Sequence, residues 1–372
     1  MPVQTPPIID PNPEVTMPDE PVDELSVELR AGGVAETAPG HLVGSAQPLG
    51  VDVSGPGPVS TAPAPSGSTP KRPGDRIFSA LASGSGLFIV VLVVLVGAFL
   101  LWKAIPAIGD DKTNFLTSRI WSVGDRANSF GIAGLLWTTV LISVFAMVVA
   151  VPIAVGIALF VTHYAPARLA KPVAAVIDLL AAIPSIIYGI WGIAILAPHL
   201  TGVQNGLSSG LGWIPLFKHH NNAVGTVFDG GVVLAIMILP IITSISREVF
   251  QRTPRQNIEA ALALGSTRWE MIQLAVLPYG RPGVVSGAML GLGRALGETI
   301  AITIIVSTAG NGAPFDASLF GKGNTFASQI ATGGDALFAH PGPFIAAGLV
   351  LFVLTFLVNA AARAVVNRKT VS

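Results

Sequence analysis

Six long apolar segments constrain the fold of this chain more than any other feature. Each holds about 20 residues or more, the length that an α-helix needs to cross the hydrocarbon core of a bilayer. Because lipid offers no hydrogen bonds to the backbone, such segments cross as helices. They run over about 84–105, 131–161, 173–197, 230–250, 284–309 and 343–366. The sequence therefore predicts an all-α polytopic membrane protein with six transmembrane helices. The second segment is too long for one perpendicular crossing, so we expect it to tilt or to begin along the interface.

The composition agrees with a membrane protein. The chain is 51% hydrophobic and only 11% charged, whereas soluble domains carry about 25% charged residues. It contains no cysteine, which excludes disulfides, thiolate metal sites and cysteine nucleophiles. The formal net charge of zero averages an acidic tail with basic loops, and no nucleic acid is expected as a partner.

Residues 1–75 differ from the rest of the chain. The first 70 residues hold nine acidic residues and one basic residue, with many Pro, Gly, Ser and Ala. Such a segment cannot bury enough apolar surface to offset its ordering entropy. We expect residues 1–75 to form a disordered, acidic, Pro/Gly-rich tail, with a solvated tail favoured over a partner-binding segment. Residues 76–372 are expected to form the six-helix transmembrane domain. The start of the chain lacks the basic stretch and apolar core of a signal peptide.

Lysine and arginine set the predicted orientation. With the N-terminus in the cytoplasm and counted from residue 71 onward, the cytoplasmic side carries thirteen of these residues and the outer side carries six. The positive-inside rule favours this arrangement, and an even number of spans then puts both termini in the cytoplasm. The loop 252–283 is cytoplasmic in this topology and belongs to the most basic stretch between two spans.

This loop carries dense helix signals. Thr253 suits an N-cap with Pro254 at the first helical position, and Gly265 suits a left-handed C-terminal cap. The sequence Thr267-Arg-Trp-Glu270 has the spacing of a capping box and predicts a second short helix that ends near Pro278. The pattern therefore predicts two short helices joined by a glycine turn. From periodicity alone, they are either a docking element or a helical hairpin on the membrane surface.

The fifth apolar segment contains two charges near mid-depth, Arg294 and Glu298. A charge at the bilayer centre costs roughly 2.5–3.5 kcal/mol on insertion scales, so both side chains must face protein or water. At 100° per residue they share one narrow stripe with small residues, whose glycines predict close helix packing. The small residues are Gly283, Gly287, Gly291 and Ala301. The two charges form either a structural pair at i, i+4 or an anion path, in which the planar guanidinium suits an oxyanion and Glu298 competes with it.

Other polar residues and prolines give weaker signals. Asp178 lies early in the third segment, and we expect it at the cytoplasmic interface or at a helix terminus rather than in the transport path. Three prolines inside spans are ordinary for transmembrane helices. Three histidines in the predicted external loop 198–229 are interpreted as plain loop residues rather than a metal site. These residues are Pro152, Pro184, Pro240, His199, His219 and His220.

One pattern in the basic loop is more specific than its helix signals. Its residues are Glu259, Ala260, Ala261, Gly265, Ile272, Leu277 and Pro278. This pattern resembles the signature of the inner-membrane permeases of ABC importers. The resemblance implies a type I ABC importer permease fold, whose first loop helix is a coupling helix that docks on a cytoplasmic ATPase. The implied ATPase-coupling residues are Glu259, Ala260, Ala261 and Gly265. The chain has no G-x-x-x-x-G-K-[ST] phosphate loop, so ATP and Mg²⁺ are expected on a separate ATPase chain, and no cofactor or metal is expected here.

A second resemblance concerns the fifth segment. Gly293-Arg-Ala-Leu-Gly-Glu-Thr299 is similar to a segment of phosphate-specific transport permeases, in which this Arg and this Glu are implicated in phosphate passage. Residues 180–192 and 234–247 match the same group, nearer to the PstC type than to the PstA type. The resemblance covers about residues 75–370. It implies a substrate path at Arg294 and Glu298, and a permease subunit that moves phosphate into the cytoplasm by alternating access.

The resemblance also implies an assembly in the bacterial cytoplasmic (inner) membrane. The expected partners, besides the lipid bilayer, are a second permease (PstA-like), two copies of a cytoplasmic ATPase (PstB-like) and an extracytoplasmic phosphate-binding protein (PstS-like). Two alternatives stay open: a permease for another oxyanion such as sulfate or molybdate, and an ion-gradient-driven secondary transporter, which would not need the loop helices. The sequence has no HExxH or Gly-x-Ser-x-Gly motif and no clustered carboxylates, so no enzyme is expected.

Overall fold

The computed structural model describes residues 73–124, 129–218, 224–306 and 316–368. The predicted acidic tail lies outside the described residues up to residue 72. The long helices are α1 (Pro73–Gly109), α2 (Ala133–Leu159), α6 (Val227–Gln251), α9 (Leu277–Gly297) and α13 (Pro341–Arg368). The shorter helices are α3 (Ala167–Ala181), α4 (Ser185–Trp191), α5 (Ala197–Leu211), α7 (Arg255–Ala263), α8 (Arg268–Met271), α10 (Ile300–Ile305), α11 (Phe326–Ala331) and α12 (Gly334–Ala339). Two antiparallel strands of two residues each, β1 (Trp121–Ser122) and β2 (Ser129–Phe130), pair with each other.

Five helical stretches in the described residues are long and apolar enough to cross a membrane, by length and composition. They are Ile77–Gly109, Ala133–Tyr164, Ser185–Leu211, Val227–Gln251 and Pro341–Ala364. Four of the six predicted spans correspond to these stretches directly. The over-long second span is one continuous helix, in which α2 runs into a π-helical turn at Phe160–Tyr164.

The third predicted span, 173–197, is wrong in its bounds. The helix α3 stops at Ala181, and the chain leaves helical geometry before Pro184, which is the N-cap residue of α4. From there α4, a π-helical turn at Gly192–Leu196 and α5 form a long helix that ends at Leu211. The predicted external loop is therefore helical over its first residues, and His199 lies on α5 rather than in a loop. His219 and His220 lie outside the described residues.

The fifth predicted span, 284–309, is also interrupted. The helix α9 starts seven residues earlier than predicted and ends at Gly297. Glu298 adopts an extended conformation with φ −69° and ψ 122°, and the short helix α10 follows. Residues 307–309 lie outside the described part. A hydropathy pattern alone does not reveal such a break, because the residues on both sides of it remain apolar.

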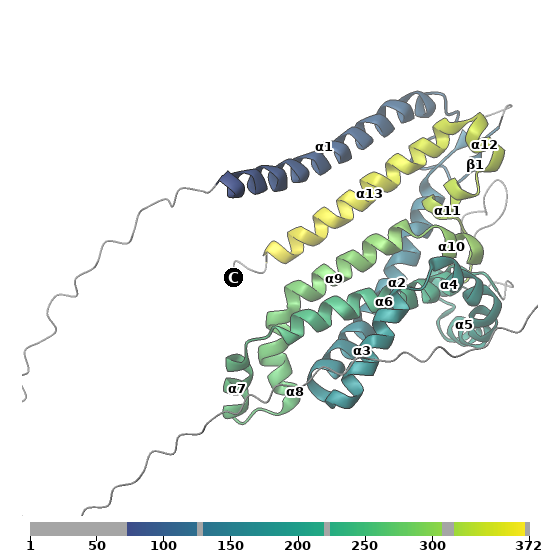
Figure 1. Ribbon diagram of the computed structural model, residues 1–372. Coiled ribbons are helices and arrows are strands. Elements are labelled where there is room, and N and C mark those ends of the chain that lie inside the picture. Colours follow the sequence, from purple (N-terminus) through teal and green to yellow (C-terminus); the bar gives the residue numbers. More distant parts are fainter. Residues whose placement is uncertain (1–72, 125–128, 219–223, 307–315, 369–372) are drawn as a thin grey trace, which may run out of the picture. The chain divides into compact units, whose positions relative to one another are not determined.

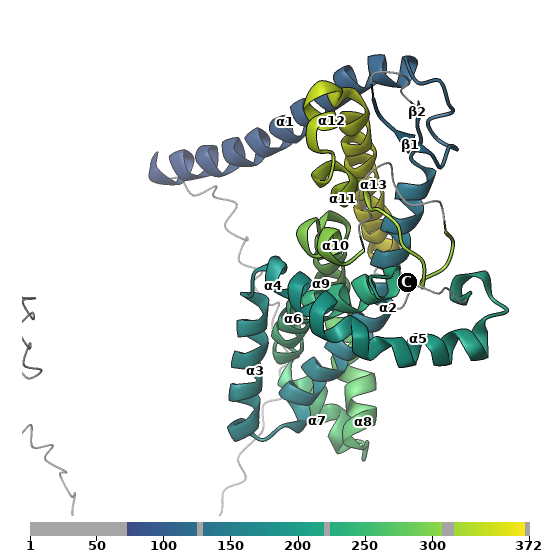
Figure 2. The same cartoon turned by 90° about the vertical axis from the view of Figure 1, so that its right-hand side faces the viewer.

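The core of the bundle lies where α2, α6 and α9 pack together, and α6 is the most buried of the five apolar stretches. The helix α1 packs on α13 and otherwise exposes its apolar side chains. Figure 1 shows α7 and α8 at one end of the bundle, whereas α10, α11, α12 and β1 lie at the other. Figure 2 shows the same separation from the side. The polar loop helices are therefore remote from the hairpin end.

The segment 310–342, between the fifth and sixth predicted spans, contains short helices in its described part. Its described part begins at residue 316 and holds the helices α11 and α12. An extended stretch before α11 is buried on the start of α6: the N–H groups of Val227 and Phe228 donate to the carbonyls of Gly321 (2.9 Å) and Leu319 (2.7 Å). These bonds satisfy two of the backbone donors that a helix N-terminus leaves unpaired.

Candidate functional site

The basic loop forms the two short helices that the sequence predicts, α7 and α8. Gly265 joins them with φ +82°, a left-handed conformation that favours glycine. Thr267 and Glu270 form the predicted capping box. The Thr267 hydroxyl accepts the Glu270 N–H (3.3 Å), while Glu270 Oε2 accepts the N–H (2.7 Å) and the hydroxyl (2.8 Å) of Thr267. These bonds hold the pKa of the Glu270 carboxyl below its ordinary value, because they stabilise its charged form.

Two details of the predicted loop are wrong. The N-cap of α7 is Pro254, while Thr253 is buried and its hydroxyl makes no hydrogen bond to any described residue. Pro254 has an extended backbone (ψ 130°) directly before the helix and provides no side-chain cap. The second helix does not end near Pro278 but continues through a π-helical turn at Ile272–Val276 into α9. The loop is therefore continuous with a long helix of the bundle.

A small apolar cluster fixes the loop to the bundle. Its buried members are Ala158, Leu159, Phe250, Ala261, Met271, Ile272 and Val276. Ala261 faces this cluster, whereas Glu259, Ala260 and Gly265 are exposed. Leu264 beside the glycine turn is 89% exposed. The outer face of α7 is therefore solvent-exposed and ends in the apolar side chain of Leu264, while its inner face packs on side chains of α2 and α6.

The glycine stripe of α9 packs against α6 as predicted. A Cβ at Gly283 would overlap Val249, one at Gly287 would lie 3.2 Å from Ile245 Cβ, and one at Gly291 would lie 2.9 Å from Ile242 Cδ1. Gly280, one turn earlier, meets Phe250 in the same way. Small residues let two helix backbones approach closely where lipid provides no hydrophobic drive between them.

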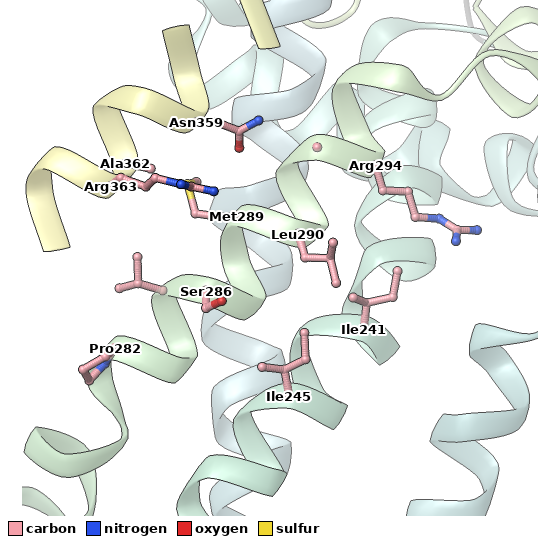
Figure 3. A pocket seen from close by; sticks show the side chains of 12 residues that line it. Ile241, Ile245, Pro282, Ser286, Met289, Leu290, Arg294, Asn359, Ala362 and Arg363 are labelled. Atoms are coloured by element: carbon pink, nitrogen blue, oxygen red, sulfur yellow. The ribbon is translucent and has the colours of Figure 1, made fainter. Parts of the chain in front are cut away.

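Arg294 follows this stripe in the last turn of α9 and is half-buried. Its Nε is buried and has no hydrogen-bond partner in the described part of the chain. A cleft of about 740 Å³ runs between α6, α9 and α13 beside it, lined mainly by apolar side chains. Figure 3 shows the Arg294 side chain directed away from α13, while Asn359 and Arg363 project from α13 toward α9. Arg294 is thus a cation with an Nε–H donor left unpaired by the described residues, and it lies three residues before the end of α9.

Of the two alternatives for Arg294 and Glu298, the structural pair at i, i+4 is not present in the described residues. The helix ends between them, so the two side chains do not continue one stripe. Glu298 Oε1 instead accepts the N–H of Ala301 (3.1 Å) at the start of α10. The ion pairs between described residues are Arg247–Asp178 and Arg252–Glu248. Arg294 and Glu298 do not form one.

A family model for the binding-protein-dependent transport system inner membrane component matches residues 150–371. The chain belongs to this family. The permease protein PstC 2 of the phosphate transport system of Mycobacterium tuberculosis is 52% identical over 307 residues, covering 81% of this chain and 94% of that protein. The corresponding PstC proteins are 49% identical over 314 residues in Mycobacterium leprae (82% and 98% covered) and 38% identical over 306 residues in Xylella fastidiosa (79% and 91% covered).

A solved inward-facing structure of the MetNI methionine ABC transporter is also similar, with a TM-score of 0.45 and 21% identity. The matched region covers 64% of this chain and 94% of the chain in the MetNI structure. At this distance the likeness adds nothing to the family assignment. Membership identifies the chain as a multi-pass membrane permease subunit of an ABC importer rather than an enzyme. Such a permease works with a substrate-binding protein and with an ATPase.

Within this permease, Asp178 has a structural partner. Its Oδ2 accepts from Arg247 Nη2 at 3.3 Å, which links α3 to α6. Arg247 is 18% exposed and Asp178 is 53% exposed. The expectation that Asp178 lies outside the transport path stays a prediction.

Asp229 is a buried carboxylate that sequence reasoning missed. It accepts hydrogen bonds from Gln204 Nε2 (2.7 Å), the Gly225 N–H (3.0 Å), and the N–H and hydroxyl of Thr226 (3.1 and 3.0 Å). The network ties α5 to the start of α6. The signal was present, because Thr226 and Asp229 have capping-box spacing directly before an apolar run.

Proposed function

We propose that this permease carries inorganic phosphate into the cytoplasm. The observation that supports the proposal most strongly is the 52% identity, over 81% of the chain, to a protein named as a phosphate transport system permease. A second support is Arg294, whose planar donor fork suits an oxyanion and whose Nε has no partner within the described structure. The chain itself performs no covalent chemistry in this account.

Alternating access in this proposal is driven through the loop helices. An ATPase binds the exposed face of α7, at Glu259, Ala260 and Gly265, and Ala261 anchors the helix from inside. The apolar cluster behind Ala261 then passes the movement to α2, α6 and α9. Since α8 continues into α9, displacement of the loop shifts the helix that carries Arg294. ATP and Mg²⁺ act on the ATPase, not on this chain.

The complete transporter has more subunits than this chain. We propose a PstA-like second permease that supplies the other half of the pathway, two PstB-like ATPases and a PstS-like phosphate-binding protein. The assembly lies in the bacterial inner membrane, with both termini and the loop helices in the cytoplasm. The excess of Lys and Arg on that side, thirteen against six under the predicted topology, supports this orientation.

Labelled phosphate uptake tests the substrate. Cells that lack their own high-affinity phosphate permease would express the chain with its neighbouring subunits, and uptake would be measured with and without excess sulfate. We expect phosphate uptake that resists sulfate. Uptake of sulfate in place of phosphate, with the complex assembled, would contradict the proposed substrate and favour another oxyanion. Uptake that persists in a complex whose ATPase cannot hydrolyse ATP would contradict the importer mechanism and favour a gradient-driven transporter.

A further inference from the structure

Two helix interruptions meet inside the permease. The first separates α3 from α4 at residues 182–184, and the second separates α9 from α10 at residues 298–299. The helices that follow the interruptions pack together, so closely that a Cβ at Gly189 would lie 3.0 Å from Ala301 Cα. Non-helical backbone at membrane depth persists only where protein buries it or where it lines a water-filled path. Transporters commonly build their substrate sites from such interrupted helices.

Tyr188 closes the first interruption. Pro184 has no N–H, so the Leu180 carbonyl lacks the donor that a continuous helix would provide. The Ile183 N–H reaches this carbonyl at 3.3 Å, and the Tyr188 hydroxyl donates to it at 2.9 Å. Tyr188 is only 6% exposed. The buried Tyr188 hydroxyl therefore bonds a carbonyl eight residues earlier in the chain and holds the end of α3 against α4.

The same side chain belongs to the buried apolar cluster that also contains Ala295 on α9, the residue after Arg294, and Ile302 on α10. Arg294 belongs to the last turn of α9, and its Nε lacks a partner among the residues described. One side chain thus holds the end of α3 and packs in the cluster next to the α9 turn that carries Arg294, the cation that we place on the anion path.

We propose that Tyr188 is a positioning residue of the phosphate path. It keeps the α3–α4 interruption in register with Arg294, so that the guanidinium faces the junction where the two interrupted helices meet. Because the hydroxyl proton is committed to the Leu180 carbonyl, Tyr188 acts through this geometry and not as an anion donor in this structure. The inference rests on the proposed function, since it concerns the same anion path.

The test is Tyr188→Phe, which removes the hydroxyl and keeps the ring. The matched control is Tyr164→Phe, because Tyr164 is 43% exposed at the far end of the α2 stretch. Each variant would be reconstituted with the second permease, the ATPase and the binding protein, and labelled phosphate uptake would be measured over a range of phosphate-loaded binding protein. We expect the maximal rate of Tyr188→Phe to fall roughly fivefold, the worth of one buried hydrogen bond. The half-saturating concentration of binding protein stays unchanged, and the control matches the wild type.

A second variant separates positioning from general structural damage. In the Arg294→Lys background, which keeps the charge but loses the planar fork, Tyr188→Phe should cause no further loss of rate. A wild-type rate in Tyr188→Phe, or losses that multiply independently in the double variant, would overturn the inference. Failure of the proposed function is distinguishable, because the assembled wild-type complex would then import no phosphate before any variant is compared.

Discussion

A methyl group added at Gly283 tests the close packing of α9 on α6. The new Cβ would lie 2.8 Å from Val249 Cβ and closer still to both Val249 Cγ atoms. Rotation of the valine does not move its Cβ, so the helices must separate by at least roughly 0.7 Å to restore the ~3.5 Å at which carbon atoms attract each other. Overpacking of this kind costs about 1–3 kcal/mol. Replacing glycine by alanine inside a helix returns about 1 kcal/mol.

Gly293→Ala is the matched control on the same helix. No atom lies within 4 Å of a Cβ at Gly293, so this variant receives only the helix-propensity gain. The two variants therefore differ by the overpacking cost alone, about 1–3 kcal/mol. The assay is the temperature at which each purified variant loses its monodisperse state in one detergent, and Gly283→Ala should have the lower midpoint. A midpoint for Gly283→Ala that equals or exceeds that of Gly293→Ala would refute the packing argument.

Three further predictions follow from the same structure. Gly265→Val forces a β-branched residue into a left-handed turn at a cost of roughly 1–2 kcal/mol. Phosphate uptake should therefore fall while the chain still inserts into the membrane. Normal uptake, with the ATPase co-purified at the wild-type level, would exclude the docking role of this turn. Asp229→Asn replaces one acceptor oxygen of a buried network that includes Gln204, and should cost about 1–3 kcal/mol as a lowered thermal midpoint; an unchanged midpoint would contradict this. Glu270→Gln should lower the midpoint at neutral pH. The folded pKa of Glu270 lies below its ordinary value, so its contribution is present above that ordinary value and is lost as the pH falls through the folded pKa. The gap between the variant and the wild type should therefore close in acid, and a pH-independent gap would exclude the Thr267 network as its source.

The loop helices were predictable because their signals are local. Thr267 and Glu270 lie three residues apart, and a capping box needs nothing beyond that spacing. Gly265 is similar, since a left-handed cap depends on the residue itself. The glycine stripe of α9 was also visible, because its four-residue period records a face that must accept another helix.

The interruptions at Pro184 and Glu298 were not predictable in the same way. Hydropathy measures how apolar a segment is, and it is insensitive to backbone breaks within that segment. Pro184 gave a partial signal, but prolines are common in transmembrane helices and seldom end them. The helical wheel placed Glu298 on a continuing α9, but α9 ends at Gly297, and Glu298 accepts the N–H of Ala301 in the first turn of α10. The place of Tyr188 depends on contacts between α4 and α10, which no local pattern encodes.

The most direct measurement is phosphate uptake by the reconstituted transporter with Arg294→Ala. Arg168→Ala provides the control, because Arg168 is an exposed arginine on α3, outside the proposed path. The account predicts that phosphate uptake vanishes in Arg294→Ala although the complex assembles and its ATPase remains bound, while Arg168→Ala transports as the wild type does. Phosphate uptake at the wild-type rate in an assembled Arg294→Ala complex would contradict the claim that phosphate passes at this arginine.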